Sequence, residues 1–121
     1  MGSKISGGVL LLRVLYSFEL PRGAKIGKNV EFVHRGLGTV ISSLCEIGDN
    51  CRIQHHVTIG VRNKECKAPK IGKNVEIGCY ATILGDVTIG DNAVIGANTL
   101  VLHDVEPNTT YIGDSTMKRI R

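Results

Sequence analysis

An aliphatic side chain returns at every sixth position through the second half of this 121-residue chain. The series that shows this runs Ile71, Ile77, Ile83, Ile89, Ile95 and Val101. A period of six is neither the 3.6-residue period of an amphipathic helix nor the two-residue alternation of a half-buried strand. It is typical of a parallel β-helix built from hexapeptide repeats.

Each repeat supplies one short strand and one corner, and three repeats make one coil whose strands pair with the coils about 4.8 Å above and below. The aliphatic residue points inward, so Ile59, Ile77 and Ile95 are predicted to stack in one core column. The third place after it often holds Asn, which tolerates the positive φ of a tight corner. The members of this Asn series are Asn29, Asn50, Asn74, Asn92 and Asn98. The repeat predicts an all-β fold of about five coils over residues 23–112.

Composition agrees with a narrow aliphatic core, since aromatic residues make up 4% of the chain and Trp is absent. The four cysteines show no metal-binding spacing. Cys45 and Cys51 occupy the place of small core residues, which favours packed free thiols and a reducing cytoplasm. The net charge of +4 suits a small anionic ligand and is too diffuse to indicate nucleic-acid binding.

Residues 1–18 lie outside the repeat and are predicted to form a short helix or extended arm. Their apolar stretch, residues 9–18, is about half as long as a membrane span requires and contains Arg13. No signal-peptide pattern precedes it. A contact with a membrane surface is the lesser alternative. At the other end, residues 114–121 form a basic tail after the repeat domain, which we place at residues 19–113.

Two interruptions break the repeat. Three extra residues lie within residues 33–40, where two glycines allow the chain to bulge and where His34 is found. Residues 61–70 lack an aliphatic marker and are predicted to be a solvated loop that replaces one face of a coil. The alternative is an arm that reaches over a neighbouring subunit's site with its cationic residues, Arg62, Lys64, Lys67 and Lys70.

The first interruption places two histidines together. One coil is eighteen residues and the bulge adds three, so the residue stacked on His55 is His34. We expect their imidazoles to lie about 5 to 7 Å apart on neighbouring coils. His56 takes the corner place that Asn fills elsewhere and is predicted to point outward. An interruption that adds nothing to the core is a favourable place for function.

Several segments then carry a resemblance to a known family: ELPRGAKIG, VHRGLGTVI, RIQHHVTIG, APKIGKNVEIG, ILGDVTIGDNAVIGANTLVLHDV and YIG. In this order they resemble the serine acetyltransferase branch of the hexapeptide acyltransferases, and most of all the short capsular and exopolysaccharide O-acetyltransferases of the colanic acid type. The resemblance covers residues 19 to about 113. It implies a left-handed parallel β-helix, a homotrimer with active sites between subunits, and acetyl-CoA as donor.

The resemblance also implies roles for single residues. His34 is the general base that takes the proton of an acceptor hydroxyl, and Glu19 is the carboxylate that orients its imidazole. His55 has a supporting role at the acceptor or the oxyanion, and no metal is expected. Acetyl-CoA lies in a groove between subunits. The residues that match its contacts are Gly60, Ala81 and Ala93, with Lys118 or Arg119 meeting its phosphates.

The acceptor is the open question. A second histidine of the serine enzymes falls on Ala68, and few residues precede the repeat where those enzymes have a helical domain. We therefore favour a sugar hydroxyl of a surface-polysaccharide precursor, with L-serine as the alternative. Two further hypotheses are a zinc hydratase of the γ-carbonic anhydrase plan, with three histidines around one metal at a subunit interface, and a β-helix scaffold without catalytic activity.

Overall fold

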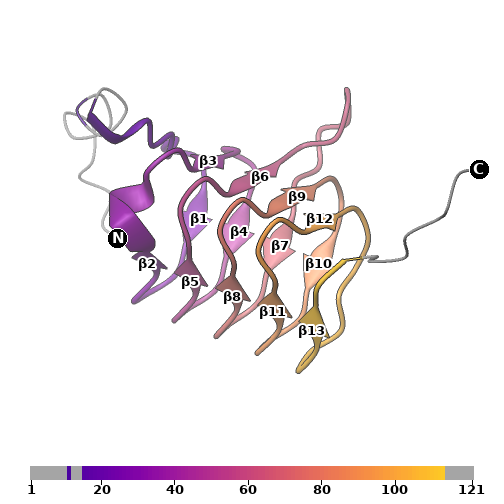
Figure 1. The fold of residues 1–121 in the computed structure, drawn as a ribbon. Coiled ribbons are helices and arrows are strands. Elements are labelled where there is room, and N and C mark those ends of the chain that lie inside the picture. Colours follow the sequence, from indigo (N-terminus) through magenta and orange to yellow (C-terminus); the bar gives the residue numbers. More distant parts are fainter. Residues whose placement is uncertain (1–10, 12–14, 114–121) are drawn as a thin grey trace, which may run out of the picture.

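The computed structural model describes residue 11 and residues 15–113, and its short parallel strands form a three-sided column (Figure 1). The first sheet contains β1 (Lys25–Ile26), β4 (Glu46–Ile47), β7 (Lys70–Ile71) and β10 (Thr88–Ile89). The second contains β2 (Glu31–Phe32), β5 (Arg52–Ile53), β8 (Glu76–Ile77), β11 (Val94–Ile95) and β13 (Thr110–Tyr111). The third contains β3 (Val40–Ile41), β6 (Thr58–Gly60), β9 (Thr82–Leu84) and β12 (Leu100–Val101). This arrangement confirms the predicted all-β parallel β-helix.

The chain visits the three sheets in turn, and we name the bends between them. The first corner joins the first and second sheets, the second corner joins the second and third, and the third corner leads back to the first. Four turns of the column are complete. The fifth is partial: Val105 forms a single bridge to Ile89, and β13 pairs with β11. The column therefore has four complete coils and one incomplete coil, where about five were predicted.

The core is the inward row of aliphatic residues that the period of six identifies. Ile53, Ile59 and Ile83 are 0% exposed, and their neighbours in the same rows are nearly as well buried. Small residues such as Ala81 and Cys51 fill the space beside the corners. Burial of aliphatic side chains contributes roughly 1.5 to 3 kcal/mol each, so the stacked rows are what holds the coils together.

The first corner is built in the same way at every turn. Its third residue is Asn, with φ between 57° and 63°, at Asn29, Asn50, Asn74, Asn92 and Asn108. Each of the later four donates its backbone N–H to a carbonyl of the coil before. Side-chain bonds join Asn29 to Asn50 at 3.2 Å and Asn92 to Asn108 at 3.0 Å. The interpretation of the Asn series as corner chemistry is confirmed, and Asn108 extends it.

The loop of residues 61–69 is an insertion at the third corner and replaces no face of a coil. β7 pairs with β4 on one side and β10 on the other, so the first sheet runs through the insertion without a gap. In Figure 1 the loop extends from the column between β6 and β7. Our prediction of a missing face was wrong because six extra residues can leave the column at a bend and return to the same sheet.

The same insertion changes the core register that the sequence predicts. Ile59 stacks on Ile83, not on Ile77, because the loop shifts the pairing of β6 and β9 by six residues. Ile77 stacks on Ile53 and on Ile95. The predicted pair Ile77 and Ile95 is confirmed, while Ile59 belongs to the neighbouring row.

The first coil is covered by residues just before the repeat. Phe18 and Leu20 are 3% and 2% exposed and join the core cluster. Most of the predicted arm, residues 1–18, and all of the predicted tail, residues 114–121, lie outside the described residues. Within the described part of the chain, no helix is long and apolar enough to cross a membrane.

Candidate active site

The bulge after β2 is a short left-handed turn, η1 (Val33–Gly36), in which His34 and Arg35 have φ of 55° and 57°. A left-handed residue other than glycine costs about 1 to 2 kcal/mol, and such strain is concentrated at functional sites. The turn is fixed by its surroundings. The Leu37 amide donates to the His34 carbonyl at 3.1 Å, and Gly36 lies so close to the Phe18 ring that a Cβ there would overlap it.

The bulge brings His34 against His55. β2 pairs with β5 so that Phe32 lies beside Ile53, and the same offset of 21 residues relates the two histidines. Their ring centroids are 5.0 Å apart with the rings at 85°. This confirms the spacing predicted from the register. His34 is exposed and His55 is half-buried, so the pair lies at the surface of the second corner.

Two more rings continue this cluster. His56 has φ of 54°, which confirms that it takes the corner place of Asn. It stacks on Tyr80 with centroids 4.7 Å apart and planes 12° apart. Tyr80 also lies edge-on to His55 at 5.7 Å. The second corner therefore carries four rings on three neighbouring turns, which we call the corner cluster: His34, His55, His56 and Tyr80.

Tyr80 is the site residue that the sequence interpretation missed. It stands three places after Ile77, where the repeat holds Asn on other turns, and its φ of 62° matches theirs. Asn occupies this place on the next turn of the same corner, as Asn98. A bulky aromatic residue in a left-handed position that favours Asn was the signal that could have identified it.

Glu19 lies on the other side of the bulge. It forms a parallel bridge with Val40, the first residue of β3. Its amide donates to the Thr39 carbonyl at 2.8 Å, and its carbonyl accepts from the Ile41 amide at 3.0 Å. Glu19 and His34 thus flank the segment that returns from the bulge to β3. That Glu19 orients the His34 imidazole stays a prediction.

The predicted coenzyme contacts fall into three groups. Gly60 ends β6 and is half-buried, so it stays a prediction. Ala81 and Ala93 are 0% exposed, and their backbone carbonyls accept from Thr58 and Glu76 on the coil before. Their side chains fill the core, and a contact of these two residues with the coenzyme, expected mostly through the backbone, stays a prediction. Lys118 and Arg119 lie outside the described residues.

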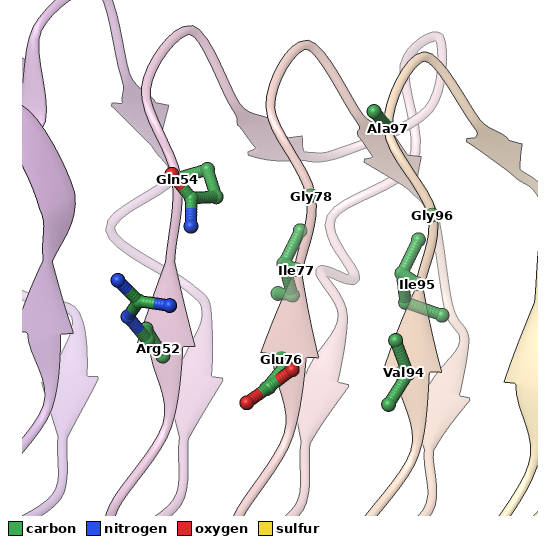
Figure 2. A pocket seen from close by; sticks show the side chains of 9 residues that line it. All are labelled: Arg52, Gln54, Glu76, Ile77, Gly78, Val94, Ile95, Gly96 and Ala97. Atoms are coloured by element: carbon green, nitrogen blue, oxygen red, sulfur yellow. The ribbon is translucent and has the colours of Figure 1, made fainter.

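A shallow hollow of about 200 Å³ lies on the second sheet, next to the corner cluster. Figure 2 shows its lining on β5, β8 and β11, with Arg52 and Glu76 at one end and Gln54 at the other. Gly78 and Gly96 form its floor near the second corner. Because Gln54 directly precedes His55, a ligand in this hollow would lie beside the histidine pair.

The buried cysteines take no part in this site. Cys45 and Cys51 are each 1% exposed and free, as predicted. Burial raises the pKa of the Cys45 thiol to about 11, and it also raises the pKa of Cys51. Their thiols donate to carbonyl oxygens of Ile59 and Gly72 at 3.4 and 3.0 Å. A thiol held in its neutral form is a poor nucleophile.

A single-chain metal site is not built by the described residues, since no three of their His, Cys, Asp or Glu side chains gather around one point. The zinc hydratase hypothesis places three histidines around one ion at an interface between subunits, so it stays a hypothesis that a single chain does not test.

Comparison with known proteins agrees with the fold. Residues 68–103 match the family model described as bacterial transferase hexapeptide (six repeats). A protein named serine acetyltransferase from Staphylococcus epidermidis is 44% identical over 105 residues, covering 85% of this chain and 49% of that protein. One of the same name from Staphylococcus aureus is 43% identical, covering 84% of this chain and 48% of the other.

Solved structures give the same picture. Soybean serine acetyltransferase, crystallised in complex with serine, is 41% identical with a TM-score of 0.79, over 85% of this chain and 43% of that one. Serine acetyltransferase isoform 3 from Entamoeba histolytica, in complex with cysteine, has a TM-score of 0.81 and 28% identity, over 98% and 44% of the two chains. The chain spans about half the length of the curated relatives it matches. These relatives do not support the closer resemblance to capsular O-acetyltransferases.

Proposed function

The chain carries the repeat domain of the hexapeptide-repeat transferases, and from this premise we propose that it is an acetyl-CoA-dependent O-acetyltransferase acting on a small hydroxyl-bearing acceptor. The observation that carries the proposal is the pair His34 and His55, placed 5.0 Å apart at the surface by a left-handed bulge. L-Serine is the first acceptor to test because the relatives are named serine acetyltransferases.

The proposed reaction is a direct transfer. A ring nitrogen of His34 takes the proton of the acceptor hydroxyl as its oxygen attacks the thioester carbonyl of acetyl-CoA. The tetrahedral intermediate then expels the CoA thiolate, which leaves as the thiol after taking the proton from His34. The products are the acetyl ester and free CoA. No covalent enzyme intermediate is required, in agreement with the inert buried thiols.

Neighbouring groups have supporting roles in this mechanism. Glu19 is the proposed carboxylate partner of the His34 imidazole, which it would hold in one tautomer while stabilising the imidazolium. His55 and backbone amides of the second corner are the proposed donors to the oxyanion, since donors fixed where charge develops are worth several kcal/mol in such reactions. The hollow between β5 and β11 and the half-buried Gly60 are the proposed contacts of the pantetheine arm.

We also propose that the enzyme is a cytoplasmic homotrimer with its sites between subunits. Outward side chains of the third sheet support self-association, because Val40 and Leu100 are 38% and 53% exposed there, at the two ends of the sheet. The insertion of residues 61–69 is the proposed arm toward a neighbouring subunit. Lys67 of this insertion forms an exposed ion pair with Asp86 at 3.5 Å, so the insertion contacts the next turn of its own chain.

A sugar hydroxyl is the second candidate acceptor. The resemblance places a histidine of the serine enzymes at Ala68, and here that position is a methyl group that is 7% exposed. A site without that imidazole would hold a serine acceptor differently. The corner cluster adds two rings, His56 and Tyr80, at the place where an acceptor would lie beside His34.

The test measures thiol release from acetyl-CoA with L-serine and with a panel of sugars and sugar nucleotides as acceptors. His34→Asn preserves the left-handed turn, because Asn tolerates positive φ, and removes the base. We expect turnover to fall by about 10²- to 10⁴-fold with the affinity for CoA unchanged. His103→Asn is the matched control, an exposed histidine far along the chain near β13. Unchanged turnover in His34→Asn would remove His34 from the mechanism.

A further inference from the structure

One ring nitrogen of the corner cluster is left without a partner. Nδ1 of His55 is buried and has no hydrogen-bond partner, and it is the one such side-chain nitrogen or oxygen that the described part of the chain contains. The residue as a whole is half-buried. Nε2 is therefore the nitrogen of this ring that faces outward, toward solvent or a ligand.

The burial of Nδ1 has an identifiable cause. Three rings surround the His55 imidazole edge-on: His34 at 5.0 Å, His56 at 5.8 Å and Tyr80 at 5.7 Å, all at steep interplanar angles. None of these rings is placed to form a hydrogen bond with Nδ1. The contact is repeated in the backbone, where the Tyr80 amide donates to the His55 carbonyl at 3.1 Å.

His56 and Tyr80 are themselves held tightly. Their rings stack almost in parallel. On the side of the coil before, Gly38 lies so close to the His56 imidazole that a Cβ at this position would overlap the ring, and the His56 amide donates to the Leu37 carbonyl at 2.7 Å. Gly38 of the bulge thus packs against the His56 ring, which stacks on Tyr80, and both rings contact His55 edge-on.

A buried N–H without an acceptor is rarer in proteins than a buried acceptor without a donor, which reflects its larger free-energy penalty. A proton on Nδ1 would be such a buried donor. A proton on Nε2 faces outward, where water or a ligand accepts it. The surroundings therefore favour the Nε2–H tautomer of neutral His55. Which nitrogen carries the proton decides whether an imidazole donates or accepts at its outer edge.

We propose that Tyr80 and His56 are positioning residues that hold His55 in its Nε2–H tautomer, so that His55 donates a hydrogen bond to the reacting oxygen beside the base His34. This inference rests on the proposed acetyl transfer. Two adjacent imidazoles then have opposite roles: His34 accepts a proton from the acceptor, and His55 donates a hydrogen bond to the acceptor or the oxyanion. The pair does not supply two interchangeable bases.

The first test reads the tautomer in the unliganded protein. Long-range proton–nitrogen correlation NMR of the imidazoles at alkaline pH, where neutral rings are compared, distinguishes Nδ1–H from Nε2–H. We expect the Nε2–H pattern for His55, and the Nδ1–H pattern would overturn the proposal. In Tyr80→Asn and His56→Asn we expect a mixture of tautomers, whereas His103→Asn should leave the pattern of His55 intact. Asn is the residue at the same place on the fourth turn of this corner, Asn98, so the backbone is preserved.

The second test separates donation from packing. His55→Ala should lower kcat by about 10²- to 10³-fold, the loss expected on removing one oxyanion donor. His55→Gln keeps an N–H donor of similar reach and should restore most of kcat. Tyr80→Asn and His56→Asn should lower kcat by about tenfold, as expected of a misplaced donor, with KM for acetyl-CoA unchanged.

The outcomes separate the two proposals. If no acceptor in the screen is acetylated, the proposed function fails, and the NMR experiment still decides whether Tyr80 and His56 set the tautomer. If acetyl transfer is found but His55→Gln is as inactive as His55→Ala, the donor role of His55 is wrong. If Tyr80→Asn and His56→Asn change neither the tautomer nor kcat, their positioning role is wrong while the proposed function stands.

Discussion

The first and second corners of the column require the same left-handed backbone conformation but contain different residues. At the first corner every turn places Asn at the left-handed position, from Asn29 to Asn108. At the second corner the same place, three residues after the inward residue, holds Arg35, His56, Tyr80 and only then Asn98, with φ between 54° and 62°. The backbone N–H of each corner residue from His56 to Asn98 donates to a carbonyl of the coil before, as at the first corner.

The two corners differ in how well their residues tolerate positive φ. Asn adopts positive φ more readily than most residues other than glycine. A larger side chain at such a position reduces the folding stability by about 1 to 2 kcal/mol unless another contact favours it. The first corner holds Asn on all five turns, while the second holds less tolerant residues on three turns in succession. Local departures of this kind are expected where a site is built. The four rings of the corner cluster lie at that departure.

The largest expected effect comes from replacing three rings of the corner cluster with Asn, the residue of the first corner. The triple variant His34→Asn, His56→Asn and Tyr80→Asn should lose acetyl transfer by about 10²- to 10⁴-fold, since it removes the proposed general base and the rings beside it. Thermal unfolding should show no loss of stability. Asn29→His, which places an imidazole at the first corner, should leave transfer unchanged in the same thiol-release assay. Full activity of the triple variant would show that the two corners do not differ in function.

The next largest effect tests what the two corners share. Ile77 lies on β8, the strand between them, and is 1% exposed. Ile77→Ala should reduce the free energy of unfolding by about 2 to 5 kcal/mol, through lost burial and the cavity that remains. Chemical denaturation measures this. A loss under about 1 kcal/mol would mean that the coils collapse around the gap and that the core is less rigid than its burial indicates.

A third test uses the small residues that face inward. Burial raises the pKa of the Cys45 thiol from 9.0 to about 11, so the unfolded chain releases this proton at lower pH than the folded chain. Stability from this thiol is complete below about pH 9 and is lost as the pH rises toward 11. The loss should amount to about 2 to 3 kcal/mol. Cys45→Ala should show a smaller decline over this window, and an equal decline would assign it to other groups.

The smallest effects should have opposite signs at the two corners. Asn74→Ala puts a less tolerant residue at positive φ and should destabilise the column by about 1 kcal/mol. Tyr80→Asn does the reverse and should leave stability unchanged or raise it by up to about 1 kcal/mol, while activity falls. Urea denaturation of the two variants measures both. Destabilisation by Tyr80→Asn would mean that the ring is held for packing more than for function.

The sequence was sufficient for the fold because one period governs it. Counting in sixes identifies the inward row, the Asn corner and, with the bulge of three residues added, the contact of His34 and His55. The same counting failed at residues 61–69, since a sequence does not say whether extra residues replace a strand or leave at a bend. Ile59 was therefore assigned to the wrong row.

The site was less predictable than the fold for a physical reason. Ala81 and Ala93 are expected to contact a ligand, yet their place in the repeat also makes them core residues with 0% exposure, so periodicity alone does not separate the two roles. Tyr80 was missed because the sequence predicts only an exposed corner residue, and its contacts with His55 and His56 on the preceding coil are known only from the structure. Ring contacts between turns depend on χ angles and on the bulge, which periodicity does not contain.

Because the coils pair at a constant distance, the side-chain positions along the second corner are evenly spaced. A side chain moved from one turn to the next advances by about 4.8 Å along the axis and stays in line. Moving a ring to another coil therefore changes its distance from a bound substrate only by multiples of the coil spacing.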